Sequence, residues 1–136
     1  MKVKCISNTG KALNGYQRKP LGSSDITQYG QLEISKEYIV MGMIMSEGYL
    51  TYLVDDGVIS ACPYQLFEVI DNKLTSNWFF KSFTKDDDIY PYQEAVWGYY
   101  ELCFDINHYE QLVDMEENAM RIYFRRKIEI ENELLE

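Results

Sequence analysis

Several kinds of residue are scarce in this chain of 136 residues, and each scarcity excludes a class of site. The chain has one histidine and three cysteines. A single imidazole cannot supply a histidine-rich zinc site or a His-Glu-x-x-His helix. The cysteines are odd in number and far apart, without a Cys-x-x-Cys pair, at Cys5, Cys62 and Cys103. This spacing predicts free, buried thiols rather than a disulfide framework or a thiolate zinc centre.

Long apolar runs and basic residues are also scarce. No stretch approaches the roughly eighteen uninterrupted apolar residues of a membrane span. Residues 8–11 are polar and follow the N-terminus before the apolar stretch of a signal peptide could form. The chain has 13 Lys and Arg against 22 Asp and Glu, a net charge of −9. Nucleic-acid binding is therefore disfavoured, because a phosphate backbone attracts clustered basic residues. We expect a cytoplasmic protein that does not bind a membrane.

The sequence contains no recognisable catalytic or cofactor motif. Gly10 and Gly15 lack the spacing of a phosphate-binding loop. The acidic run Asp86–Asp88 lacks the alternating spacing of a calcium loop, which favours an acidic surface loop. A helix-capping role explains Asp105, and a surface or half-buried position explains His108, so the pair does not require a catalytic role. We therefore predict no catalytic residue, no metal site and no cofactor, and a non-enzymatic role is favoured over catalysis.

The residues that are plentiful are apolar, acidic and aromatic. Apolar residues make up 46% of the chain, and twenty residues are aromatic, twelve of them tyrosine. A chain of this length forms one domain that buries about two-thirds of its extended surface. Residues 1–30 carry five basic residues and one acidic residue, whereas residues 31–106 carry four basic and thirteen acidic residues. The middle of the chain therefore carries most of the negative charge.

Residues 31–71 consist of short β-branched and aromatic runs separated by turn residues, a pattern that predicts antiparallel β structure. Asp55-Asp56-Gly57 is a strong hairpin signal, because glycine adopts positive φ without a Cβ clash. Residues 8–30 are rich in Gly, Asn, Ser and Pro and predict a long loop. The expected strands are Val3–Ile6, Glu37–Met45, Tyr49–Val54, Val58–Cys62 and Leu66–Ile70, with a helical turn at Pro63–Gln65.

This β region resembles the SH3-like barrels of many small, uncharacterised bacterial and phage proteins. The likeness rests on a turn before Glu37–Val40, a hairpin to Tyr52–Gly57 and the run Pro63–Val69. It implies a small SH3-like antiparallel β-barrel and says almost nothing about function. Proline-rich-peptide binders of this class carry a Trp after the hairpin and a Tyr three positions after the proline. This chain has no Trp before Trp78 and has Leu66 at the second position, so we expect no polyproline groove.

The fold class is therefore α+β, with a single domain over residues 1–136. We expect a β-rich part at 1–71, an aromatic and acidic segment at 72–104 that wraps the barrel, and a helical part at 105–136. A short helical turn is expected near Trp97–Leu102.

The helical part is predicted to hold two helices. Asp105 is expected to cap a helix over Ile106–Asp114, and a second helix is expected over Glu116–Leu135. The second helix carries acidic residues in its first turn and a repulsive pair at Glu129 and Glu133. Its expected apolar stripe consists of Met120, Tyr123, Phe124, Ile128 and Leu135.

The aromatic residues are the strongest remaining signal, because tyrosine and tryptophan are enriched at interface hot spots. Twenty of them exceed what a small barrel and two helices need. The aromatic residues that fit buried positions are Tyr38, Tyr52, Phe67, Phe79 and Phe124. The predicted partner-binding surface lies in the acidic middle of the chain and consists of Asp86, Asp87, Asp88, Tyr90, Tyr92, Trp97, Tyr99 and Tyr100.

These features favour a non-enzymatic, acidic protein-binding module with a basic protein partner, because an acidic surface attracts a positive one. By analogy with other small acidic bacterial proteins, an immunity or inhibitor protein is one form of this hypothesis. A small-ligand-binding or hydrolytic domain, with its site between the barrel and residues 8–30, is the alternative. A nucleic-acid-binding barrel with stacking aromatic residues is a second alternative, which the net charge disfavours. The pattern does not fix an oligomeric state.

Overall fold

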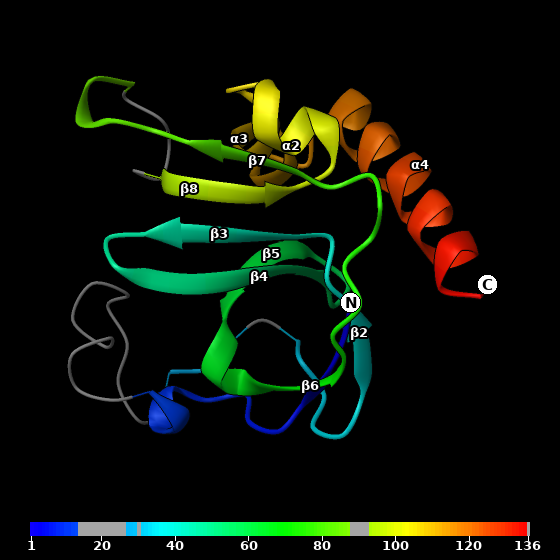
Figure 1. Ribbon diagram of the computed structural model, residues 1–136. Helices are drawn as coiled ribbons and strands as arrows, with labels where there is room; N and C mark the ends of the chain where they lie inside the picture. Colours follow the sequence, from blue (N-terminus) through cyan, green and yellow to red (C-terminus); the bar gives the residue numbers. More distant parts are fainter. Residues whose placement is uncertain (14–26, 30, 88–92, 136) are drawn as a thin grey trace.

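Two antiparallel sheets and C-terminal helices make up the computed structural model, which describes residues 1–13, 27–29, 31–87 and 93–135 (Figure 1). The three-stranded sheet has the order β2-β1-β6, with β1 at Lys2–Cys5, β2 at Glu37–Ile39 and β6 at Phe67–Asp71. The five-stranded sheet has the order β5-β4-β3-β8-β7, with β3 at Gly42–Ser46, β4 at Tyr49–Asp55, β5 at Ile59–Pro63, β7 at Phe79–Ser82 and β8 at Gln93–Gly98. The α+β class is thereby confirmed, and the described strands do not close into a barrel.

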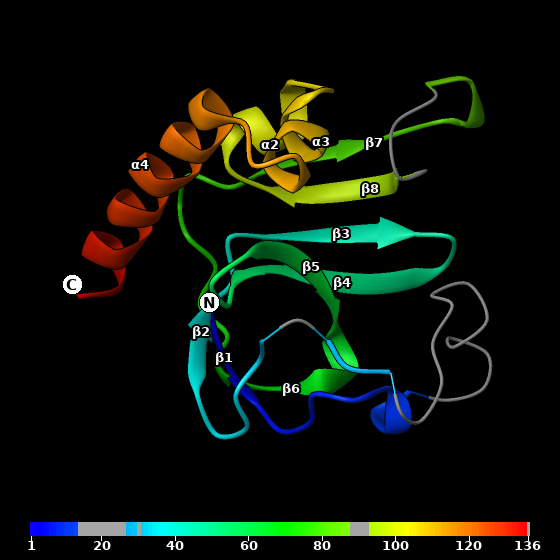
Figure 2. The same ribbon diagram turned by 180° about the vertical axis from the view of Figure 1, so that it is seen from behind.

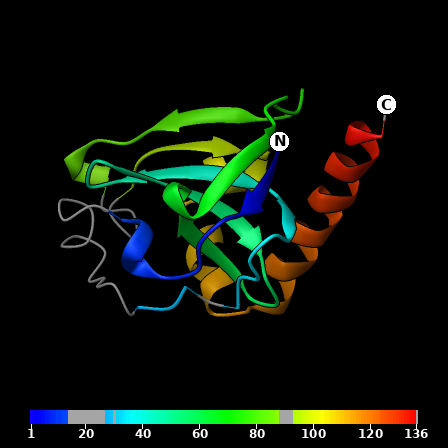
Figure 3. The same cartoon turned by 90° about the horizontal axis from the view of Figure 1, so that it is seen from below.

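Three α-helices follow the strands: α2 at Tyr100–Phe104, α3 at His108–Val113 and α4 at Glu117–Leu134. Single 3₁₀ turns lie at η1 (Gly10–Ala12), η2 (Tyr64–Leu66) and η3 (Lys85–Asp87). Helices α2 and α3 lie on the side of the five-stranded sheet away from the three-stranded sheet, as seen from front and back (Figures 1 and 2). Helix α4 runs along one side of both sheets (Figure 3). None of the described helices is long and apolar enough to cross a membrane.

The hairpin between β4 and β5 forms where the sequence predicts it. Gly57 has φ 106°, a conformation in which a side chain would be strained. The Asp55 carboxylate accepts a hydrogen bond from the Gly57 N–H at 3.0 Å, and the Asp56 carboxylate accepts one from the Val58 N–H at 3.1 Å. Short acidic side chains therefore satisfy the turn's backbone donors, and the predicted helical turn after β5 is also present as η2.

The expected single strand Glu37–Met45 is wrong, because the chain changes sheets in its middle. The Val40 N–H donates to the Met1 carbonyl at 3.1 Å, while the next N–H, of Met41, donates to the Leu53 carbonyl at 2.9 Å. Both side chains are fully buried. Strand β2 therefore belongs to the three-stranded sheet and β3 to the five-stranded sheet.

The segment 72–104 also differs from the expected wrapping segment. It contributes β7 and β8, which pair antiparallel with Phe80 opposite Trp97, and β8 then pairs with β3. An aromatic and acidic stretch thus extends the second sheet to five strands. The expected turn near Trp97–Leu102 is helix α2, which begins at Tyr100.

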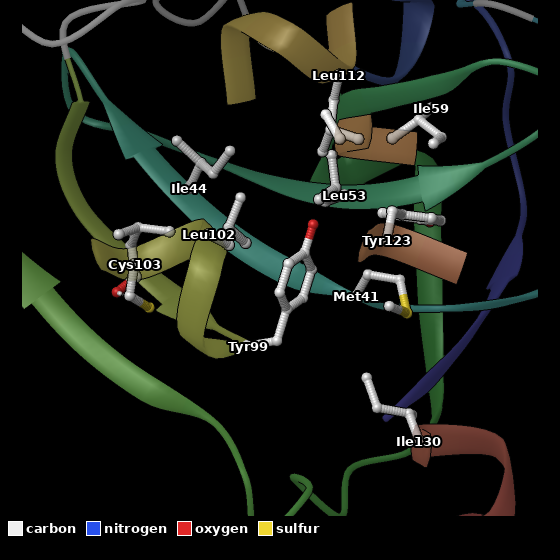
Figure 4. Packing of buried hydrophobic residues seen from close by; sticks show 12 residues of the cluster. Met41, Ile44, Leu53, Ile59, Tyr99, Leu102, Cys103, Leu112, Tyr123 and Ile130 are labelled. Carbon is white, nitrogen blue, oxygen red and sulfur yellow. Dashed lines mark hydrogen bonds between the residues drawn. The ribbon is translucent and has the colours of Figure 1, made fainter. Parts of the chain in front are cut away.

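Two hydrophobic cores lie on the two faces of the five-stranded sheet. One lies under the helices and includes Ile44, Leu53, Leu102 and Tyr123 (Figure 4). The other lies between the sheets. It contains Tyr38, Tyr52 and Phe67, the three aromatic residues whose burial was correctly predicted. Phe79 and Phe124, also expected in the core, are 44% and 39% exposed, so that prediction is wrong.

The two predicted helices are present, but their details differ. Asp105 does not cap α3, whose N-cap residue is Asn107; instead its carboxylate accepts a hydrogen bond from the Asn107 N–H at 3.1 Å. Helix α4 buries Ala119, Tyr123 and Ile130 rather than the full expected stripe. The expected stripe residues Ile128 and Leu135 are 60% and 85% exposed.

All three cysteines are free and buried, as predicted. Burial raises the pKa of the Cys62 and Cys103 thiols to about 11. A thiol is a nucleophile only as thiolate, so neither residue is activated.

Candidate functional site

The acidic residues of the predicted partner surface lie at the far end of β7. Asp86 and Asp87 are exposed in η3, where the Asp87 carboxylate accepts a hydrogen bond from the Thr84 N–H at 2.6 Å. This contact closes a tight turn. Asp88, Tyr90 and Tyr92 lie outside the described residues.

The described aromatic residues of that surface point to three different places. Trp97 is half-buried on β8, with its ring 5.0 Å from the ring of Phe80. Tyr99 is 2% exposed and lies in the core beneath the helices (Figure 4). Tyr100 is 52% exposed and packs against Phe79 at 5.7 Å between ring centroids. The described part of the predicted surface is therefore not one patch.

Tyr99 is held by the chain's single histidine. The Tyr99 hydroxyl lies 2.6 Å from His108 Nε2, and the imidazole is fully buried, so the expected surface or half-buried position is wrong. Burial lowers the pKa of His108 and raises the pKa of Tyr99 well above its ordinary value. Both groups are therefore neutral at pH 7. The Asp105 carboxylate accepts a hydrogen bond from the Asn107 N–H in the turn before His108. This arrangement is a buried hydrogen-bonded pair in the core.

A cavity of about 390 Å³ lies between the second half of α4, residues 75–79 and the start of α2. We call it the acidic–aromatic cavity. Its aromatic wall consists of Trp78, Phe79, Tyr99 and Tyr100. Its remaining lining is Thr75, Asn77, Arg126, Glu129, Ile130 and Glu133. Among the described residues of the predicted surface, Tyr99 and Tyr100 line this cavity.

The cavity contains two carboxylates from the second half of α4. Glu133 lies in the last turn, where the helix dipole is unfavourable to negative charge, and Glu129 lies one turn before it. Glu129 and Glu133 are also four residues apart, a spacing at which like charges repel each other. The last turn of α4 contains no basic residue. Arg126 binds Glu129 and the Ser76 N–H binds Glu133, which offsets part of this cost. A cation in the cavity would reduce the remaining repulsion.

The guanidinium of Arg126 is already neutralised by protein carboxylates. Its Nε and Nη2 donate to the two Glu101 oxygens, each at 2.8 Å, and its Nη1 donates to Glu129 at 3.0 Å. These bonds raise the pKa of Arg126 and hold the pKa of Glu101 below its ordinary value. Arg126 thus stabilises the wall of the cavity and is not available as an anion site.

Polar atoms without a partner also lie in the cavity wall. Thr75 is 7% exposed, and its hydroxyl oxygen has no hydrogen-bond partner among the described residues; neither has Trp78 Nε1. A buried polar atom left unpaired costs stability, and such atoms occur where a ligand or water completes the site. The Ser76 N–H donates to Glu133 at 2.7 Å, which holds this segment against α4.

A second cavity of about 390 Å³ lies on the other side of α4, next to β2 and the β4–β5 hairpin. Both of its lysines are paired within the protein: Lys127 Nζ lies 3.6 Å from an Asp55 carboxylate oxygen, and Lys36 Nζ lies 3.5 Å from a Glu33 carboxylate oxygen. Among the described residues, only Tyr38 contributes an aromatic ring to its wall. This cavity is the weaker candidate.

The described ranges contain no cluster of three or more His, Cys, Asp or Glu placed to hold a metal ion. Comparison of the chain with family models, curated proteins and solved structures found no match. The acidic–aromatic cavity is therefore the candidate site on its own geometry.

Sequence reasoning missed most of this cavity. Its residues come from three segments, 75–79, 99–100 and 126–133, and only the fold brings them together. One signal was visible in the sequence: the repulsive pair Glu129 and Glu133 near the end of a helix, which local stability alone does not explain.

Proposed function

We propose that this protein is a non-enzymatic protein-binding module that recognises a basic partner, with a lysine or arginine side chain of the partner entering the acidic–aromatic cavity. The observation that carries the proposal is the position of Glu129 and Glu133. Both carboxylates line an aromatic cavity, and Glu133 lies in the last turn of α4, where negative charge is least stable.

The aromatic wall supports a cationic occupant. A positive group over the face of Trp or Tyr gains about 0.5–2 kcal/mol from the ring quadrupole. Trp78 and Tyr100 line the cavity together with the two glutamates, and the nearby guanidinium of Arg126 is already paired. The site therefore combines cation–π attraction with carboxylates whose charge is only partly balanced.

The charge of the whole chain supports a macromolecular partner. A net charge of −9 repels phosphate backbones and accelerates association with a positive protein surface. An acidic module that covers the basic surface of a nucleic-acid-handling enzyme would act as an inhibitor or immunity protein. Most of the loop that the small-ligand alternative requires, residues 14–26 and 30, lies outside the described residues.

We also propose that residues 1–71 form an SH3-like arrangement, extended by β7 and β8. Two observations support this assignment. The strands pair in the orders β2-β1-β6 and β5-β4-β3, and a 3₁₀ turn lies between β5 and β6. An SH3-like framework fits a binding role, although the fold alone does not imply one.

The experiment uses Trp78 as a reporter inside the cavity. The chain has two tryptophans, so Trp97→Phe leaves Trp78 as the only one. Titration with acetyl-arginine N-methylamide should change Trp78 emission with a dissociation constant on the order of 1–10 mM. The double variant E129Q/E133Q in this background should weaken binding about tenfold, because it removes two charges worth about 0.5–1 kcal/mol each.

Two controls make the result specific. Acetyl-norleucine N-methylamide has a similar length and no charge, and it should not produce the response. Glu117→Gln removes a charge from the same helix at a site whose side chain is 89% exposed, and it should leave binding unchanged. An equal response to the neutral probe, or an unchanged affinity in E129Q/E133Q, would show that the cavity does not recognise positive charge.

A further inference from the structure

Strand β7 is the outer strand of the five-stranded sheet (Figures 1 and 2). Its first residue, Phe79, lines the acidic–aromatic cavity. All four of its residues, Phe79–Ser82, are exposed. No strand in the described part of the chain pairs with its outer edge. An open sheet edge is a template to which an extended segment of another protein can add as a further strand.

The backbone groups that face outward can be assigned from the pairing with β8. The Phe83 N–H donates to the Glu94 carbonyl at 2.9 Å, so Phe83 faces β8. Backbone groups alternate in direction along an antiparallel strand. Lys81 therefore also bonds toward β8, and the N–H and C=O groups of Phe80 and Ser82 point to the open edge.

Aromatic rings border this edge on both faces of the sheet. On the helix face, Phe79 packs against Phe104 at 5.6 Å between ring centroids. On the opposite face, Phe80 is 53% exposed and packs against Trp97. An added strand would place alternate side chains on these two apolar surfaces, which gives the edge both backbone and side-chain contacts.

Both ends of β7 are acidic. Phe79 lines the cavity that contains Glu129 and Glu133, and Asp86 and Asp87 follow the other end of the strand. At about 3.4 Å per residue, the strand separates these ends by about 10 Å. A segment of six residues spans about 17 Å, so it covers the strand and places a basic first and last side chain about one residue beyond each end.

We propose that the basic partner docks by adding an extended segment to the edge of β7, with one basic side chain in the acidic–aromatic cavity and another near Asp86 and Asp87. This mode of binding rests on the proposed function for the identity of the partner. A second copy of this chain is a poorer occupant, because it would bring a further net charge of −9 to the same edge.

The test uses the full chain and a defined peptide, acetyl-Arg-Val-Thr-Val-Thr-Arg-amide, titrated by calorimetry. We expect this peptide to bind at least tenfold more tightly than acetyl-arginine N-methylamide. Ser82→Pro removes an outward N–H and keeps the pairing toward β8, so it should lower the affinity for the peptide at least tenfold. Ser82→Ala keeps the N–H and should bind as wild type. Neither substitution should alter the response to capped arginine.

A second measurement does not depend on how the proline variant folds. Adding the peptide to the wild-type chain should slow hydrogen exchange at the Phe80 and Ser82 amides. Two forms of the peptide, N-methylated on alternate backbone nitrogens, should differ, because only one set faces β7.

The outcomes separate the two proposals. Strand addition would be overturned if capped arginine binds and Ser82→Pro binds the peptide as tightly as wild type does. It would also be overturned if the two N-methylated peptides bind equally well. Either result would leave the proposed role of the cavity intact. If wild type binds neither probe, both proposals fail. A dimer in light scattering that Ser82→Pro dissociates would identify a second copy as the occupant and overturn the basic partner.

Discussion

A pair of glycines sets how closely helix α2 approaches the sheet, and this contact can be tested directly. Gly42 and Gly98 are opposite each other on β3 and β8, and the side chain of Leu102 packs over both. A Cβ at Gly98 would lie 2.7 Å from Leu102 Cδ2, 3.2 Å from Gly42 Cα and 3.2 Å from the Met41 carbonyl oxygen. Gly98→Ala therefore forces α2 away from the sheet.

The magnitude follows from which atoms can move. Leu102 is 4% exposed and has little room, and the other two contacts are with backbone. Overpacking of this kind costs about 1–3 kcal/mol. Because unfolding entropy is about 2.1 cal/mol/K per residue, a chain of this length should lose about 4–10 °C in Tm. Displacement of α2 should also move Tyr100 and weaken capped-arginine binding.

Thermal and urea unfolding followed by circular dichroism measure the effect, and a double-mutant cycle assigns it. Leu102→Ala alone should cost about 2–5 kcal/mol through the cavity it leaves. The double variant G98A/L102A should be more stable than the sum of the single effects by about 1 kcal/mol, because one clash is gone. Additive losses, or a Gly98→Ala variant as stable as wild type, would refute the close-packing argument.

Three other predictions concern titration and reactivity. Because the pKa of His108 is lowered in the folded chain, the unfolded chain binds a proton below pH 6.5 that the folded chain does not. The free energy of unfolding should therefore fall below pH 6.5, by at most about 1.4 kcal/mol per pH unit. Urea unfolding at several pH values should show this slope in wild type and not in His108→Gln. Glu101→Gln should lower the free energy of unfolding, measured with urea, by about 1.5–3 kcal/mol, because it removes a charged partner from the largely buried Arg126. The exposed control Glu117→Gln should change this free energy little. Cys103 should react with a disulfide reagent at pH 8 only as fast as the chain opens, since its thiol is buried and has a pKa of about 11, and rapid labelling of the folded chain would contradict this.

The local signals in the sequence located most elements of the fold. The Asp55-Asp56-Gly57 turn fixed one hairpin, and the acidic first turn and apolar spacing of α4 located that helix. The sequence did not reveal the break at Val40–Met41, because both residues are apolar and are buried on either side of it. The change from one sheet to the other depends on which strand lies next to each residue. That strand comes from another part of the chain, so the segment's own sequence does not reveal it.

The candidate site was harder to predict, because tyrosine occurs both in protein cores and on protein surfaces. Tyr99 and Tyr100 are neighbours in sequence, yet one is buried against His108 and the other is half-exposed at the cavity. The turn from β8 into α2 sends their side chains in different directions. Composition identified an aromatic surplus in this region, and only the packing of α2 on the sheet decides which rings remain open.

The bond between Tyr99 and His108 gives the molecule a built-in spectroscopic probe. Tyr99 lines the acidic–aromatic cavity, while its hydroxyl is bonded to the chain's one imidazole in the protein interior. A ligand that shifts the Tyr99 ring will change the magnetic environment of that imidazole, and its ring-proton signals cannot be confused with those of another histidine. Occupancy of the cavity can therefore be followed by proton NMR on the unlabelled, unmodified chain.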